Sequence, residues 1–180
     1  MKTRYPMLYA LIAAIALSWS AGTIADEDTT YYAQHSFYVY KGKHVTTNYH
    51  TGMLVPINSP IKITSEGRKK IKIELPDLDN TEVVIVNAKK HTQKNMQEIK
   101  ERMFGTKKVN LKTSSKSVRD AILSGQVIEG MTKKETILAY GYPPTHVTPT
   151  TVANQWTYWV SKWNRIIVNF ENDKIKSILD

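Results

Sequence analysis

Five histidines are the residues of this 180-residue chain best suited to bind a metal ion or to transfer a proton: His35, His44, His50, His91 and His146. No two of them have the i,i+4 spacing that places side chains on one helix face, and none stands in a cluster with carboxylates. His44 and His50 could meet across a hairpin, but a zinc site needs three or four ligands. We therefore expect no metal and no cofactor.

The other residue types used in catalysis form no recognisable motif. The chain has no cysteine, which excludes thiol chemistry, disulfides and lipid attachment to a cysteine. It contains neither the G-x-S-x-G nucleophile motif nor the glycine-rich phosphate-binding motifs. Asp77 and Asp79 lie in a turn sequence, which explains them without a catalytic role. We expect that the protein is not an enzyme.

Aromatic and basic side chains gather near the end of the chain. Trp156, Tyr158 and Trp159 lie in one predicted strand, where alternation places Trp156 and Tyr158 on one face and Trp159 on the other. One interpretation buries Trp156 and Tyr158 in the core and packs Trp159 on the N-terminal half. The other interpretation is an exposed contact patch, since aromatic residues and arginine dominate interface energetics. The candidate partner-binding residues are Tyr142, Trp159, Lys162, Trp163 and Arg165.

The first 25 residues have the pattern of a secretory signal peptide. A positively charged start precedes an apolar run over residues 7–19, which is short for a spanning helix of roughly 20 residues. We expect cleavage after Ala25, with Ser20 or Gly22 as alternative sites. An uncleaved N-terminal anchor is the other interpretation. Both export the chain, so we expect a periplasmic protein, with a peripheral position at the outer membrane as one option.

The charge balance is strongly basic. Lysine and arginine number 25 and aspartate and glutamate 16, a net charge of +9. For an exported protein this excess favours anionic lipid head groups, lipopolysaccharide or peptidoglycan as ligands, rather than nucleic acid. Solubility alone would also account for it. The oligomeric state is left open.

The elements that would position these residues fall into two parts. Residues 26–34 are expected to form a flexible leader, residues 35–105 a small β-barrel-like domain with a closing helix, and residues 106–113 a linker. In the first domain, alternating isoleucines on either side of residues 65–68 predict a hairpin. Further strands are expected at 37–40, 45–49, 53–57 and, fully buried, at 83–86, and a helix capped by Thr92 is expected over 91–104. This pattern is typical of an SH3-like barrel.

Residues 114–180 have clearer signals and predict a second, α+β domain. Ser115 can cap one helix, and Thr132 with Glu135 forms a capping box for a second helix that ends at Gly141. Strands at 155–160, 165–170 and 175–178 follow as an antiparallel meander. We expect the two helices to cover one face of this sheet.

The second domain resembles a known family. Residues 130–135 (GMTKKE), followed by a helix and residues 141–144 (GYPP), are similar to the pattern "G-M-[ST]-x-x-[ED] … G-x-P" of the SmpA/OmlA (BamE-like) domain. Residues 156–158 (WTY) resemble its W-x-Y strand, and residues 168–170 (VNF) with 172–175 (NDKI) resemble its closing hairpin. The resemblance implies an ααβββ fold, which is also like half of a β-lactamase-inhibitor protein.

What this resemblance implies is a non-catalytic protein-interaction module of the cell envelope, related to outer-membrane protein assembly or envelope maintenance. Family members tied to barrel assembly are lipoproteins, whereas this chain is not lipidated on a cysteine. The alternative function is a basic binder of anionic envelope ligands. Exposed edge strands of the first domain could also accept a peptide by strand addition.

Overall fold

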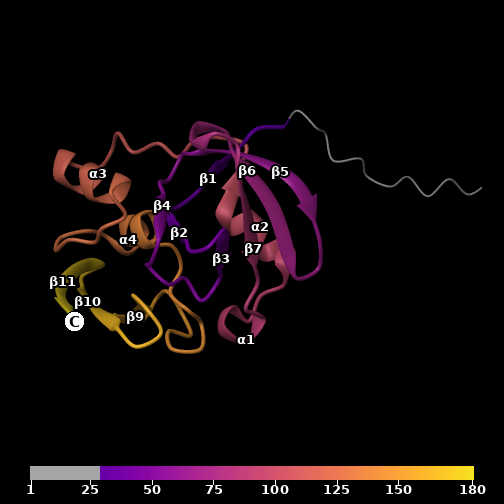
Figure 1. Cartoon of the computed structure of the whole chain (residues 1–180). Helices are drawn as coiled ribbons and strands as arrows, with labels where there is room; N and C mark the ends of the chain where they lie inside the picture. The colour runs from indigo at the N-terminus through magenta and orange to yellow at the C-terminus, as the bar shows by residue number, and fades with distance from the viewer. Residues whose placement is uncertain (1–28) are drawn as a thin grey trace, which may run out of the picture.

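The structure, a computed structural model, describes residues 29–180 and is mixed α+β. A curled β-sheet with a helix against it forms one side of the molecule, and two further helices lie beside a smaller sheet on the other side (Figure 1). The predicted signal peptide over residues 1–25 and its cleavage near Ala25 lie outside the described residues.

The large sheet has six strands, in the order β3-β7-β6-β5-β1-β8. All neighbours are antiparallel except β3 and β7, which run parallel. The predicted hairpin is confirmed as β5 and β6, and a 3₁₀ turn over Pro76–Leu78 leads from β6 to β7. The six strands are β1 (Tyr31–Ala33), β3 (Lys43–Val45), β5 (Pro60–Glu66), β6 (Lys70–Leu75), β7 (Thr81–Val86) and β8 (Phe104–Gly105). A separate antiparallel pair consists of β2 (Phe37–Val39) and β4 (Met53–Val55), which ends just before Pro56.

Residues 26–34 were expected to form a flexible leader, but Tyr31–Ala33 within this range form strand β1. Tyr31 pairs with Ile61 of β5, and Tyr32 pairs with Gly105 of β8, so this strand lies inside the sheet rather than loose before it. Ala33 is fully buried. Polar and acidic residues around β1 suggested a loose segment, but the strand is held by backbone pairing on both edges.

Two strand predictions in the first part were wrong in detail. The expected strand 45–49 ends at Val45, because residues 46–48 form a turn in which the backbone N–H of Asn48 (φ 61°) donates to the carbonyl of Val45. The strand expected to be fully buried, residues 83–86, alternates instead. Val83 and Ile85 face the core, whereas Val84 and Val86 are half-buried on the other face.

The helix expected over residues 91–104 is shorter and begins later. A single turn, α1 (Lys89–Thr92), ends where Gln93 adopts a left-handed conformation, and α2 spans Met96–Met103. Asn95, not Thr92, caps α2 by accepting a hydrogen bond from the backbone N–H of Glu98, which completes a capping box.

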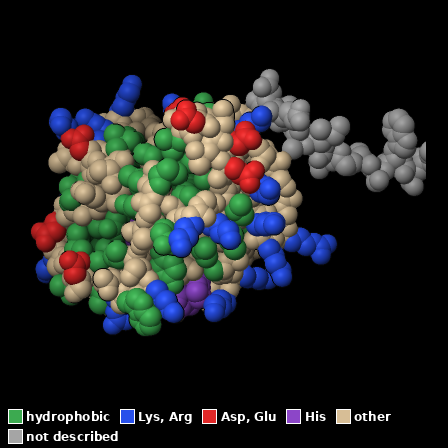
Figure 2. All heavy atoms as spheres, in the orientation of Figure 1, with side chains coloured by type: hydrophobic (Ala, Val, Ile, Leu, Met, Phe, Trp, Pro, Cys, Tyr) green, Lys and Arg blue, Asp and Glu red, His purple; other side chains and the backbone are tan. Residues whose placement is uncertain are grey.

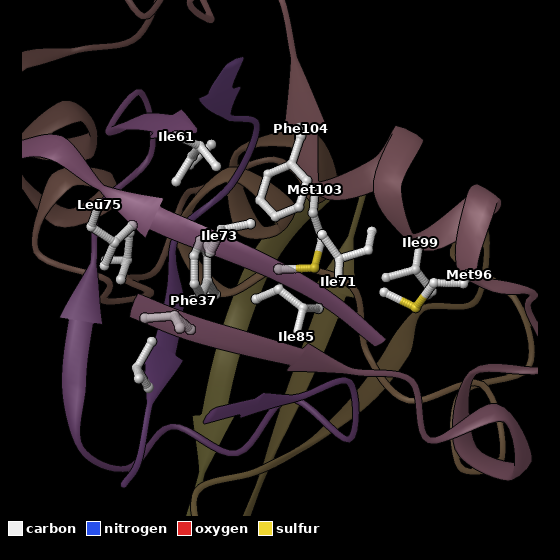
Figure 3. Close-up of a cluster of buried hydrophobic side chains, with 14 residues drawn as sticks. Phe37, Ile61, Ile71, Ile73, Leu75, Ile85, Met96, Ile99, Met103 and Phe104 are labelled. Atoms are coloured by element: carbon white, nitrogen blue, oxygen red, sulfur yellow. The ribbon is translucent and has the colours of Figure 1, made fainter. Parts of the chain in front are cut away.

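One hydrophobic core lies between the large sheet, the β2–β4 pair and α2 (Figure 3). Met96, Ile99 and Met103 of α2 point at the sheet from one helix face, at the i, i+3 and i+7 positions that the sequence predicts. Figure 3 shows these side chains beside Ile71 and Ile85 of the sheet. The burial of this helix face attaches α2 to the sheet.

The second part follows its prediction closely. Ser115 caps α3 (Lys116–Leu123), and a capping box between Thr132 and Glu135 starts α4 (Lys133–Tyr140), which ends at Gly141. The three-stranded sheet has the order β11-β10-β9. Its strands are β9 (Gln155–Trp159), β10 (Arg165–Glu171) and β11 (Lys174–Leu179).

A second hydrophobic core lies between α3, α4 and this sheet, with Trp156 and Tyr158 fully buried in it. Ile57, from the first part of the chain, is also buried in this core. Ser36 connects the parts again, since its backbone N–H donates to the carbonyl of Leu138 and its hydroxyl to that of Ile122. Within the described residues, the buried members of both cores come from Ala33 onward, and Tyr31 packs against the first core.

Candidate ligand-binding groove

Two tight turns carry exposed aromatic and basic side chains. The first connects β2 to β3. The backbones of Tyr40 and Lys43 exchange two hydrogen bonds of 2.9 and 3.1 Å, and Lys41 and Gly42 between them have positive φ angles of 50° and 70°. This is the geometry of a type I′ turn, which Gly42 favours because it has no side chain to resist a positive φ. The turn leaves Tyr40 56% exposed.

The second turn connects β9 to β10. The backbone N–H groups of Val160 and Ser161 both donate to the carbonyl of Asn164, and the Ser161 hydroxyl accepts from the N–H groups of Trp163 and Asn164. This folds the backbone back on itself and directs Trp163 outward, where it is 80% exposed. The Nζ atom of Lys162 lies 4.8 Å from the centre of the Trp163 ring, within cation–π range.

The loop between β3 and β4 fixes the second turn against the first part of the chain. The Thr51 hydroxyl donates a 2.7 Å hydrogen bond to the carbonyl of Val160, and the backbone N–H of His50 donates to that of Trp159. The His50 ring is inserted among the rings of Tyr38, Tyr140 and Tyr158. The two turns therefore have a fixed relationship, although about 120 residues separate them in sequence.

A groove with a volume of about 480 Å³ lies between these segments. We call it the basic aromatic groove; it is lined by Tyr38, Tyr40, Lys41, Lys43, His44, Val45, Tyr49, Thr51, Ser161 and Lys162. Three of these residues are lysines and three are tyrosines, and none is an aspartate or glutamate. On the face of the molecule drawn in Figure 2, lysine and arginine side chains likewise lie next to hydrophobic ones near the centre.

The buried polar groups behind the groove are uncharged at neutral pH. Burial lowers the pKa of His44 to about 4, although its ring N–H donates to the carbonyl of Tyr38 and so opposes the shift. Burial also raises the pKa of Tyr38. The positive charge of the groove therefore comes from its lysines, whose ammonium groups can pair with an anionic ligand.

The structure brings together four of the five predicted partner-binding residues. Trp159 and Arg165 are opposite each other in the β9–β10 register, and Lys162 and Trp163 form the turn between them. Trp159 is half-buried, and its indole N–H is buried without a hydrogen-bond partner among the described residues. Tyr142 is separate: its ring contacts Arg102 and His35, neither of which lines the basic aromatic groove.

Tyr40, Lys41 and Lys43 are not among the site residues predicted from the sequence. The strands expected at 37–40 and 45–49 leave Lys41-Gly42-Lys43 only as a connection between them. An aromatic residue followed by two lysines around a turn glycine was the available signal, but nothing local shows that this turn and residues 161–162 line one groove.

The histidines give no metal centre. His91 and His146 stack with their ring centroids 4.5 Å apart, and the Nδ1 of His91 is hydrogen-bonded to Thr47. Within residues 29–180, no three histidine, aspartate or glutamate side chains lie close enough together to hold a metal ion. In the same part of the chain, no helix has the length and apolar character needed to cross a membrane.

Comparisons of the chain with protein-family models, with curated proteins and with solved structures found no match.

Proposed function

We propose that this protein is a non-catalytic module of the cell envelope that binds an anionic lipid surface through the basic aromatic groove. The observation that carries the proposal is the pairing of Tyr40 with Lys41 on one turn and of Trp163 with Lys162 on the other. The groove between the turns carries lysines and no carboxylate. The envelope location rests on the signal-peptide pattern of the first 25 residues.

Two physical effects favour a lipid surface. Tryptophan and tyrosine place an apolar ring and a polar edge at the same depth, which suits the boundary between head groups and acyl chains. Each lysine near an anionic membrane contributes about 1 kcal/mol of attraction. Lys41, Lys43 and Lys162 together would therefore strengthen binding by about 100-fold.

Vesicle co-sedimentation tests the proposal with residues 26–180, which contain both hydrophobic cores. The vesicles would be pure phosphatidylcholine, or phosphatidylcholine with one quarter phosphatidylglycerol. We expect binding to the anionic vesicles only, weakening as salt screens charges beyond ~10 Å. Changing Lys41, Lys43 and Lys162 together to glutamine should weaken binding to the anionic vesicles by about 10- to 100-fold.

A control variant separates a defined site from general charge attraction. Lys69, Lys90 and Lys107 are exposed and lie outside the groove, so changing all three to glutamine removes the same charge. We expect this variant to bind within about threefold of the unchanged protein, since attraction weakens with distance from the surface. If both triple variants lose the same amount of binding, or if the unchanged protein binds neutral and anionic vesicles equally well, the lipid site does not lie in the groove.

A second candidate function is docking of an envelope protein on the β9–β10 turn. One observation favours it: the ring of Trp163 is exposed on this turn. The order α3, α4, β9, β10, β11 supports a BamE-like arrangement, and we propose an SH3-like relationship for the curled first part. Co-purification with an envelope protein that survives high salt and is lost with Trp163→Ala would favour docking over lipid binding.

A further inference from the structure

The guanidinium group of Arg102 lies over the ring of Tyr142, 4.2 Å from the ring centre. Arg102 projects from α2, and Tyr142 follows the end of α4 at Gly141. The side-chain amide of Asn48 donates to the carbonyl of Tyr142, and the buried prolines of Pro143-Pro144 come next. The ring is therefore fixed from behind, and the guanidinium group packs against it.

The hydrogen-bonding edge of Arg102 is free. The five N–H donors of a guanidinium group lie in its plane and point away from its centre. Arg102 is half-buried, yet its side chain forms no hydrogen bond or ion pair with any of residues 29–180. Hydrogen bonds from Lys94 and from the N–H of Asn95 lower the pKa of Glu98, and the charge of Arg102 helps to lower it without a hydrogen bond to that carboxylate. Glu101 accepts from Gln97.

Arg102 and Tyr142 line a groove with a volume of about 930 Å³, which is separate from the basic aromatic groove. We call it the α2–α4 groove. Its opposite wall is α4, which contributes Lys134 and the half-buried apolar side chains of Ile137 and Leu138. The volume is within the range of natural ligand sites.

We propose that the α2–α4 groove binds the C-terminal carboxylate of an apolar peptide, with Arg102 as the carboxylate anchor. A stacked guanidinium group with a free edge matches the two oxygens of a carboxylate, which it can bind with two parallel hydrogen bonds. Ile137 and Leu138 provide apolar contacts for the last side chains of the peptide. Glu98, Glu101 and Lys134 give the walls charges of both signs, which favours a peptide backbone over an alkyl chain.

Nuclear magnetic resonance titration of ¹⁵N-labelled residues 26–180 tests this proposal. The probes are N-acetyl-Leu-Phe with a free carboxylate and the same dipeptide with a C-terminal amide. We expect the carboxylate to shift the Arg102 side-chain Nε–H signal and the backbone signals of Ile137 and Leu138 in a saturable way. The amide should bind about tenfold more weakly or worse, because it loses the charge-assisted hydrogen bonds.

Three variants make the result specific to Arg102. Arg102→Met keeps the apolar stem and should abolish the preference for the carboxylate. Arg102→Lys keeps the charge but loses the planar fork, so binding should weaken by about threefold or more. Tyr142→Phe keeps the stacking ring and should bind as the unchanged protein does. The dispersion of each spectrum shows whether the variant is folded.

Equal binding of the two dipeptides, shifts confined to other surfaces, or no saturable shift at all would overturn the proposal. Binding of octanoate to the same residues more tightly than the dipeptide would also overturn it in favour of a fatty-acid site. Arg102→Met should leave vesicle binding unchanged, because Arg102 does not line the basic aromatic groove. The two proposals can therefore fail independently.

Discussion

The imidazole ring of His50 stacks on the phenol ring of Tyr140, with 3.9 Å between the ring centroids and 29° between the ring planes. His50 lies in the loop after β3, and Tyr140 is the last residue of α4. The ring nitrogen Nε2 of His50 also donates to the carbonyl of Tyr140, whereas its Nδ1 is buried without a partner. Burial raises the pKa of Tyr140 to about 12 and lowers that of His50 to about 4, so both rings are neutral at pH 7.

This arrangement predicts that the protein loses stability in mild acid. Burial lowers the pKa values of His44 and His50 to about 4, below the value of about 6.5 for an unfolded histidine. The folded state therefore binds fewer protons. The stabilisation that comes from these neutral histidines is fully present above about pH 6.5 and is lost as the pH falls toward 4. At pH 5 the free energy of unfolding should be lower by about 2 kcal/mol for each histidine. Urea unfolding at pH 7.5 and pH 5 measures the difference.

The variant His50→Phe provides the control for this prediction. Phenylalanine keeps a ring against Tyr140 but cannot be protonated, so the difference in unfolding free energy between pH 7.5 and pH 5 should shrink by about 2 kcal/mol. An unfolding free energy that is the same at both pH values in the unchanged protein would show that these histidines are not buried as described.

Tyr158→Phe should destabilise the second core. The Tyr158 hydroxyl is fully buried and donates a 3.0 Å hydrogen bond to the carbonyl of Gly141. Its removal leaves that carbonyl unsatisfied, which costs about 1–3 kcal/mol. Chemical denaturation measures the loss. The matched change Tyr40→Phe removes an exposed hydroxyl and should change the unfolding free energy by less than about 0.5 kcal/mol; equal effects would contradict the buried position of Tyr158.

The capping box of α4 gives a further prediction. The Thr132 hydroxyl accepts a hydrogen bond from the N–H of Glu135, and the Glu135 carboxylate accepts one from the N–H of Thr132. Thr132→Ala should lower the unfolding free energy by about 1 kcal/mol. Thr151→Ala, a change of the same size at an exposed site, should have little effect. If Thr132→Ala unfolds at the same denaturant concentration as the unchanged protein, the cap does not stabilise α4.

Trp163 should report the approach of a membrane. Among the tryptophans in the described part of the chain it is the highly exposed one, at 80%. When anionic vesicles are added to a protein of residues 26–180, the tryptophan fluorescence maximum should shift to shorter wavelengths and iodide should quench the fluorescence less. Both changes are expected because the Trp163 ring moves from water into the membrane interface. Trp163→Phe should remove both changes, whereas Trp159→Phe should keep them. A response that survives Trp163→Phe would place the contact on another surface.

The parts of the fold that local sequence determines were predictable. Ser115 and Thr132 cap the helices expected of them, because a cap requires only side-chain oxygens and a nearby backbone N–H. The turn between β10 and β11 follows from Asn172 and Asp173, which both have positive φ angles. The β5–β6 hairpin follows from its alternating isoleucines.

Contacts between distant segments were not predictable. The parallel pairing of β3 with β7 and the position of β1 between two strands depend on the packing of the whole sheet. At the candidate site, the predicted strands 155–160 and 165–170 place Lys162 and Trp163 in the turn between them. No sequence pattern indicates that the turn at Tyr40 lies beside this turn. The sequence also does not show that Tyr142 lies away from Lys162 and Trp163, because the path of the chain after Gly141 depends on contacts with Asn48 and Arg102.

The place of β1 in the large sheet constrains the order in which the chain can fold. Its two neighbours are β5, some 30 residues further along, and β8, more than 70 residues further along. Until Phe104 has been synthesised, one edge of this first strand has no partner, so the sheet cannot close from its N-terminal end. Such long-range pairing slows folding. A newly made chain would therefore keep this edge of β1 unpaired, and accessible to chaperones, until residues 104–105 have been synthesised.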